Sequence, residues 1–115
     1  MAPFLVFDRA GAFEMAAGSP GGSLIINYVA KVLVGTLDWN LDVQKAIDLP
    51  NFGSRNGPTE IEKGTPLEEV QAALKAMGHD VRPIDMTSGL QAIRRVRGRL
   101  EGGADPRREG VAKGR

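Results

Sequence analysis

The sequence predicts an α+β fold in which helices pack on a mainly antiparallel sheet. Two short apolar runs near the amino terminus flank a turn, which favours a hairpin. Two later stretches carry apolar residues at helical spacing, and the last third alternates strand-forming residues with glycines. With 115 residues, 42% hydrophobic and 25% charged, the chain has the composition of an ordinary globular domain. We therefore expect residues 1–115 to form a single domain.

Composition argues against several classes of protein. A net charge of +1 gives no strong overall attraction to nucleic acid or to anionic membranes. The chain has no cysteine, and its single histidine, His79, has no cluster of ligating residues around it in the sequence. The most apolar stretch, Leu24 to Leu37, is shorter than a membrane span and contains Lys31. We expect no metal, no cofactor, no nucleic acid and no membrane as partners.

The first third predicts a hairpin followed by a buried helix. Phe4 to Phe7 and Ala12 to Ala17 form the hairpin, and their consecutive apolar residues are typical of strands covered on both faces. The helix runs from Leu24 to Leu37, with Ser23 as its N-cap. We expect this helix to be mostly buried, with only Asn27 and Lys31 interrupting its apolar surface.

The middle third predicts a second helix, a loop and a strand–helix–strand unit. The second helix spans about Leu41 to Asp48, and Pro50 cannot continue it. Residues 51–58 are a loop by composition, and residues 59–62 can form a short strand. A third helix starts at a capping box made by Thr65 and Glu68, with Pro66 between them, and ends at Gly78. Its apolar stripe consists of Leu67, Val70, Ala73, Leu74 and Met77. A strand over His79 to Ile84 follows.

The last third is ambiguous between helix and strand. Apolar residues recur at helical spacing, but glycines cut the stretch into pieces too short for a good helix. Strands over Leu90 to Val96 and Arg99 to Ala104, turning at Arg97-Gly98, fit the glycines better. The residues after Pro106 are polar and terminal, so we expect them to be mobile.

The candidate functional motif is Gly18-Ser19-Pro20-Gly21-Gly22-Ser23, between the hairpin and the first helix. Gly21 and Gly22 leave their N–H groups uncovered, and these groups join the unpaired donors at the positive end of the helix dipole. Such donors suit a phosphate, a carboxylate or the oxyanion of a tetrahedral intermediate. The alternative is a tight corner without function, since the spacing fits neither dinucleotide-binding nor P-loop motifs.

This motif, followed by an apolar helix, resembles the glycine loop in the small subunit of gamma-glutamyltransferases (gamma-glutamyltranspeptidases). The likeness extends over nearly the whole chain. Its other matching segments are Phe4 to Asp8, Asp38 to Leu41, Ala46 to Phe52 with Asn51 in place of the usual arginine, Gly89 to Ile93, and Gly102 to Gly110. The glycine loop and the Gly102 to Gly110 segment are the most specific pair. The resemblance implies that residues 1–115 are the carboxy-terminal part of a small subunit.

Membership of that family would imply part of an N-terminal-nucleophile hydrolase αββα sandwich. In that family the precursor cuts itself, and the exposed threonine attacks the gamma-glutamyl amide of glutathione or a related substrate. The resemblance implies that Gly21 and Gly22 are the catalytic oxyanion donors and that Ser19 and Pro20 help to bind the substrate. It also implies a periplasmic or secreted location and no cofactor.

The nucleophile of the family has no counterpart in this sequence. None of its four threonines lies in a matching segment, and Met1-Ala2-Pro3 falls where the family carries Ser-Ser-Met-Ser-Pro. We therefore expect the chain to be inactive alone. We also expect it to pair with the remainder of a gamma-glutamyltransferase (the large subunit and the amino-terminal part of the small subunit) or with itself.

Two alternatives stay open. The chain can be a non-catalytic assembly partner that keeps the fold without the chemistry. It can also be a small basic nucleic-acid-binding module, since the final segment carries Arg94, Arg95, Arg97, Arg99, Arg107, Arg108, Lys113 and Arg115. No aromatic residue follows Phe52, so stacking on bases is not available there.

Overall fold

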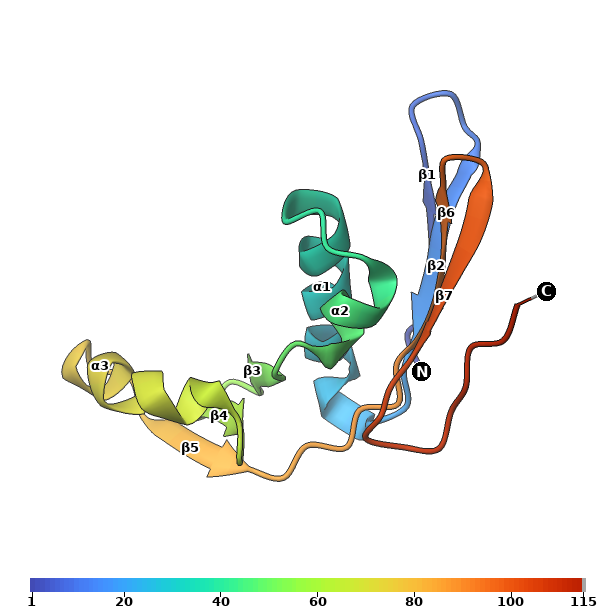
Figure 1. Cartoon of the computed structure of the whole chain (residues 1–115). Helices are drawn as coiled ribbons and strands as arrows, with labels where there is room; N and C mark the ends of the chain where they lie inside the picture. The colour runs from blue at the N-terminus through green and yellow to red at the C-terminus, as the bar shows by residue number, and fades with distance from the viewer. Residues whose placement is uncertain (115) are drawn as a thin grey trace.

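The computed structural model describes residues 1–114, which form two sheets with the first two helical segments between them and the third beside the smaller sheet (Figure 1). The larger sheet has the strand order β1-β2-β6-β7, and all its neighbours are antiparallel. Its strands are β1 (Phe4–Phe7), β2 (Phe13–Gly18), β6 (Gln91–Val96) and β7 (Arg99–Ala104). The predicted hairpin and the two predicted carboxy-terminal strands are confirmed. The β6–β7 turn uses Arg97 and Gly98, both with positive φ, as a two-residue hairpin loop requires.

The smaller sheet has three strands: β3 (Phe52–Ser54), β4 (Thr59–Glu62) and β5 (Val81–Ile84). β3 and β4 are antiparallel, whereas β4 and β5 are parallel. The expectation of an unstructured loop over residues 51–58 is wrong for β3. Gly53 lies so close to α1 (Ile25–Leu33) that a Cβ atom there would be 2.4 Å from Cγ of Asn27. The contact between Gly53 and Asn27 therefore fixes the position of β3 beside α1.

Three helical segments match the predicted ones within a few residues. The first is continuous from a 3₁₀ turn, η1 (Gly22–Leu24), through α1 to a π-helical turn, η2 (Val34–Asp38). The second is α2 (Val43–Asp48), and the third combines a 3₁₀ turn, η3 (Pro66–Val70), with α3 (Gln71–Ala76). No helix within residues 1–114 has both the length and the apolar character needed to cross a bilayer.

The core lies between the four-stranded sheet and the two helices α1 and α2 that cover one of its faces (Figure 1). α2 packs directly on β7 at Gly103, where a Cβ atom would be 2.7 Å from Cγ1 of Val43. The buried core cluster is Ala17, Leu24, Ile25, Tyr28, Val29, Val32, Val43, Ile47, Met86, Leu90 and Ala92.

The predicted cap at Ser23 is wrong, whereas Thr65 occupies the N-cap position of η3, with Pro66 at the helix start, as predicted. Ser23 lies inside the first turn and not before it, because Gly21 takes the cap position and no side chain caps the turn. The Thr65 hydroxyl donates backwards to the Glu62 carbonyl at 2.7 Å. Glu68 accepts a hydrogen bond from the Gly64 N–H at 3.1 Å, so the expected reciprocal capping box does not form.

Several apolar faces that were expected to be covered are open. Leu5 of β1 is 63% exposed, because helices cover only the other face of its sheet. Ile26 of α1 and Met77 after α3 are also exposed, whereas Lys31, expected to interrupt the apolar surface, is buried. The expectation of doubly covered strands is therefore wrong for the described chain. The first helix is mostly buried, as predicted, but its exposed positions include Ile26, Val34 and Leu37, and not Lys31.

Candidate functional site

The glycine loop connects β2 to the helical segment that begins at η1. Gly21 has φ 135° and ψ 21°, and Gly22 has φ 64°, so both adopt backbone conformations that favour glycine. Gly22 is exposed, and a Cβ atom there would have nothing within 4 Å. Among residues 1–114, neither the Gly21 nor the Gly22 N–H donates a hydrogen bond. Unpaired backbone N–H groups at the start of a helix are the kind of donors that suit an anion.

Ser19 and Pro20 join the loop to the connection between β5 and β6. The buried Ser19 hydroxyl donates to the Pro20 carbonyl at 2.6 Å and accepts from the Gly89 N–H at 3.0 Å. Gly89 packs against Pro20, since a Cβ atom at Gly89 would lie 2.8 Å from Cγ of Pro20. The Ser19 side chain therefore holds the loop from the inside, and Gly21 and Gly22 form its accessible part.

Tyr28 supports the loop from the helix side, and sequence reasoning missed it. Its ring is 2% exposed and lies against Gly21, where a Cβ atom would be 2.7 Å from Cε2 of Tyr28. Burial raises the pKa of the Tyr28 hydroxyl, and the nearby Glu62 carboxylate raises it further. Tyr28 follows Gly21 by two helical turns, and this spacing was the available signal.

A buried acid, Asp105, fixes the other side of the β5–β6 connection. Its carboxylate accepts from the Ser88 hydroxyl at 2.5 Å and from the Leu90 N–H at 3.1 Å. Burial alone would raise the pKa of Asp105, but the hydrogen bonds from Ser88, Arg107 and Leu90 outweigh it and lower this pKa. Asp105 is therefore a structural anion that ties the end of β7 to the segment beside the glycine loop.

The residues after Pro106 were expected to be mobile, and this is wrong for Arg107 and Arg108. The Arg107 guanidinium binds Glu62 through two nitrogens and donates to the carbonyls of Ile47 and Leu49 at 3.2 and 3.1 Å. Arg108 donates to the Thr87 carbonyl at 2.8 Å. Arg115 lies outside the described residues. The carboxy-terminal segment thus anchors to α2, to β4 and to the connection beside the loop.

Asn51, which replaces the arginine usual in the family segment, lies inside the same network. Its N–H donates to Glu62 at 2.8 Å, and its side-chain amide donates to Ser88 at 2.9 Å. The Asn51 side-chain oxygen is buried without a hydrogen-bond partner among residues 1–114. Asn51 therefore links β4 to Ser88 and, through it, to Asp105.

Lys31 shares its acceptors with Arg107. Its ammonium donates to the carbonyls of Ile47 at 2.8 Å and Leu49 at 2.6 Å, at the carboxyl end of α2. Burial lowers the pKa of Lys31 to about 8, and the Arg107 charge contributes to the shift. Two cations thus hold one helix end. No group of three or more His, Cys, Asp or Glu suited to a metal occurs among residues 1–114.

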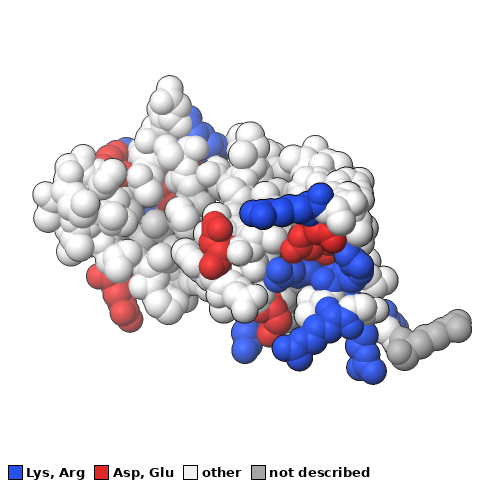
Figure 2. Space-filling model, turned by 90° about the horizontal axis from the view of Figure 1, so that it is seen from above, with Lys and Arg blue, Asp and Glu red and all other residues white. Residues whose placement is uncertain are grey.

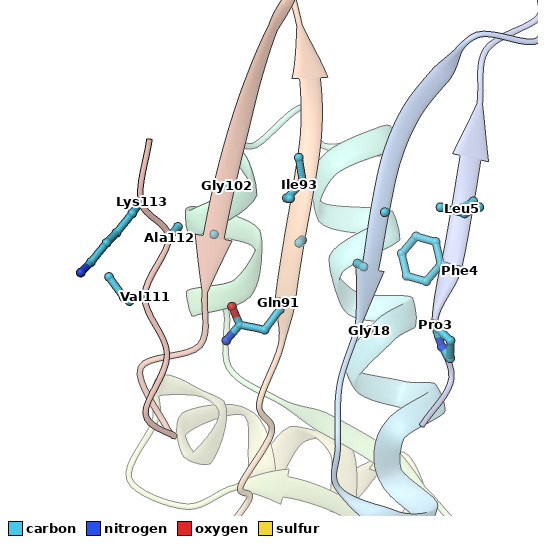
Figure 3. Close-up of a pocket in the computed structure, with 14 residues that line it drawn as sticks. Pro3, Phe4, Leu5, Gly18, Gln91, Ile93, Gly102, Val111, Ala112 and Lys113 are labelled. Atoms are coloured by element: carbon cyan, nitrogen blue, oxygen red, sulfur yellow. The ribbon is translucent and has the colours of Figure 1, made fainter. Parts of the chain in front are cut away.

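The sheet face opposite α1 and α2 contains a groove of about 910 Å³ (Figure 3). Leu5 of β1, Ile93 of β6 and Gly102 of β7 line it, and residues 111–113 border it on the β7 side. The lining is mainly apolar and includes several small residues, which is typical of a face that another layer covers.

The sequence matches the family description "Gamma-glutamyltranspeptidase" over residues 1–115. The chain belongs to this family. It is 34% identical over 110 residues to the glutathione hydrolase proenzyme of Escherichia coli, covering 93% of this chain and 19% of that protein. It is 32% identical over 94 residues to the acylase ACY 1 proenzyme of a Pseudomonas species, covering 81% of this chain and 16% of that protein.

Solved gamma-glutamyltranspeptidases share the fold. A highly active mutant of the enzyme from Pseudomonas nitroreducens superposes with a TM-score of 0.86 at 31% identity, covering 98% of this chain and 60% of that chain. The predicted partial N-terminal-nucleophile hydrolase fold is thereby confirmed. The described chain contributes one helical layer and one main sheet to it. This chain spans less than a fifth of the length of the Escherichia coli glutathione hydrolase proenzyme and of the acylase ACY 1 proenzyme.

Proposed function

We propose that this chain is the carboxy-terminal part of a gamma-glutamyltranspeptidase small subunit and supplies its Gly21–Gly22 oxyanion hole. The observation that carries the proposal is the pair of unbonded N–H groups at the start of the helical segment. Family membership supports it, because the family model matches residues 1–115 and so includes the glycine loop.

The chemistry follows from where charge develops. When a threonine hydroxyl attacks the gamma-glutamyl carbonyl carbon, its proton passes to the free α-amine of that threonine and the carbonyl oxygen becomes an oxyanion. The C–N bond then breaks as the α-amine returns the proton to the leaving nitrogen, which leaves an acyl-enzyme ester and a neutral amine. Donors already aimed at that oxygen lower the barrier, and each is typically worth on the order of 3 kcal/mol. Gly21 and Gly22 perform this role in the proposal, and the helix dipole behind them adds to it.

The substrate in this proposal is a gamma-glutamyl amide such as glutathione. A relative named glutathione hydrolase supports this substrate class. Pro20 forms part of the substrate-facing surface beside the two donors. Ser19 contributes through its backbone and by holding the loop, since its hydroxyl is buried and already bonded.

The nucleophile in this proposal comes from another part of the protein. No threonine of this sequence matches the family's nucleophile segment. We therefore propose that the chain works together with the large subunit and the amino-terminal part of the small subunit, and that it is inactive alone. The apolar groove on the open sheet face supports this pairing. By family resemblance, we place the assembled protein in the periplasm or outside the cell.

A chimera tests the proposal. This chain replaces the matching segment of the Escherichia coli glutathione hydrolase proenzyme, and release of the chromophore from a gamma-glutamyl anilide is followed. We expect turnover by the chimera and none by the isolated chain. Turnover by the isolated chain would contradict the proposed dependence on another segment. A folded, correctly processed chimera without turnover would favour a non-catalytic assembly partner, the second candidate.

A further inference from the structure

Gly21 occupies a position that no other residue suits for two separate reasons. Its φ of 135° lies where side chains are strained, and the Tyr28 ring fills the space that a Cβ atom would need. The ring comes from α1, while Ser19 and Gly89 hold the loop from the other side. The loop around Gly21 is therefore packed between the Tyr28 ring on one side and the β5–β6 connection on the other.

We propose that Tyr28 is a positioning residue that sets the direction of the Gly21 and Gly22 amides through the packing of its ring against Gly21. This inference rests on the proposed function. In the proposed reaction Tyr28 does not touch the reacting atoms. Tyr28 acts only through the backbone of the two glycines.

Glycine has no Cβ atom, so its backbone can adopt many φ and ψ values and does not by itself fix the direction of an N–H group. With two consecutive glycines, the peptide between Gly21 and Gly22 can rotate unless its surroundings stop it. The buried ring is rigid, because its two side-chain torsions are fixed by the core that surrounds it. Rotation of this peptide would turn the Gly22 N–H away, and a misplacement of about 1 Å can cost about 100-fold in rate.

The ring, and not the hydroxyl, carries the effect. Among residues 1–114 the Tyr28 hydroxyl makes no hydrogen bond, whereas Cε2 and Cδ2 lie 2.7 and 3.3 Å from the Cβ position of Gly21. Tyr28→Phe should therefore preserve the loop. Tyr28→Leu keeps an apolar side chain of smaller extent but removes the flat ring, and it should release the loop.

The first test uses the full chain alone and does not depend on activity. An aromatic ring in this position shifts the Gly21 and Gly22 amide and α-proton resonances. We expect these shifts to persist in Tyr28→Phe, and to collapse toward random-coil values with line broadening in Tyr28→Leu. Val32→Ala, in the buried core one turn along α1, is the matched control and should leave them in place. Gly21 and Gly22 resonances that stay as sharp in folded Tyr28→Leu as in the unchanged chain would show that the loop is still held, and would overturn the inference.

The second test measures kinetics in the chimera. We expect Tyr28→Leu to lower kcat by about 10- to 100-fold with a smaller change in KM, because the donors act mainly in the transition state. Tyr28→Phe and Val32→Ala should retain kcat within about threefold. An equal loss in Val32→Ala would reveal a general stability effect and overturn the assignment.

The oxyanion role of the Gly22 amide and the positioning role of Tyr28 can be tested separately. If replacing the Gly22 amide nitrogen with an ester oxygen leaves kcat unchanged, the oxyanion proposal fails whatever Tyr28 does. If that ester lowers kcat while Tyr28→Leu does not, only the positioning role of Tyr28 is wrong.

Discussion

Gly21 is subject to a local and a tertiary constraint at the same time. We expect Gly21→Ala to lower the free energy of unfolding by about 2 kcal/mol, because it adds backbone strain and a clash with Tyr28. Gly57→Ala is the control, since Gly57 has open space and no positive φ, and it should change stability by less than about 0.5 kcal/mol. Urea unfolding measures both, and equal effects would contradict the close packing of the ring.

Lys31 gives the chain a pH dependence with a defined sign. Its pKa in the folded chain is about 8, below the unfolded value of 10.5, so the unfolded chain binds more protons between these values. Stability should therefore rise from pH 8 to 9.5, with a slope of at most about 1.4 kcal/mol per pH unit.

Lys31→Met should remove this rise, because it removes the ammonium that titrates. The chain should still fold, because Arg107 still donates to the same two carbonyls. Denaturant titrations at several pH values compare the two proteins over this range. A native chain whose stability is flat or falls between pH 8 and 9.5 would contradict the buried position of the ammonium.

At the scale of elements, Arg107 holds the carboxy-terminal segment to β4 and to the carboxyl end of α2. We expect Arg107→Gln to destabilise by about 3 kcal/mol, because it leaves the Glu62 carboxylate, whose side chain is 10% exposed, without its cation. Arg82→Gln breaks an exposed ion pair with Asp80 and should cost less than about 0.5 kcal/mol. Similar losses in the two variants would show that the segment is not anchored in this way.

Local patterns were enough to predict most elements, because the relevant forces act within a few residues. In the last third of the chain, the glycines at 98, 102 and 103 favoured two strands over a helix, and β6 and β7 confirm this prediction. β3 could not be predicted, since it depends on Gly53 meeting Asn27 of a distant helix. The burial of Lys31 depends equally on carbonyls 16 and 18 residues away.

The candidate site was predicted in part. Its glycines can be read directly from the sequence because their residue type and position before a helix imply free amides. Among the residues that hold them, Tyr28 is marked only by its spacing of two helical turns from Gly21, and Gly89 and Asp105 carry no local pattern that points to the loop. They meet it only when α1, the β5–β6 connection and the end of β7 come together.

At the scale of the whole molecule, the open sheet face predicts association. Leu5 and Ile93 are exposed on the grooved face, and nothing in residues 1–114 apart from the segment beside β7 covers it. We expect Leu5→Lys and Ile93→Lys to weaken self-association or pairing with the remaining family segments by at least tenfold in Kd. Met77→Lys, on an exposed apolar residue after α3, is the control. Light scattering at increasing concentration measures the effect, and an unchanged monomer fraction would contradict it.

On the face seen in Figure 2, most of the visible Lys and Arg side chains lie on the side of the molecule that carries the four-stranded sheet, with acidic side chains among them. Several already have partners: Arg94 pairs with Glu14, Arg95 with Asp8, and Arg107 with Glu62 and Asp105. We therefore expect the chain to elute from a DNA column without a steep dependence on salt. Strong retention that falls steeply with salt would favour the nucleic-acid-binding alternative.

The most direct measurement is the rate of the chimera when a single donor atom is removed. Semisynthesis replaces the Gly22 amide nitrogen with an ester oxygen, and the same exchange at Gly57 serves as the control. We predict that the Gly22 ester lowers kcat for a gamma-glutamyl anilide by about 100- to 1,000-fold, while the Gly57 ester leaves it unchanged. A Gly22 ester as fast as the unmodified chimera would contradict the oxyanion role.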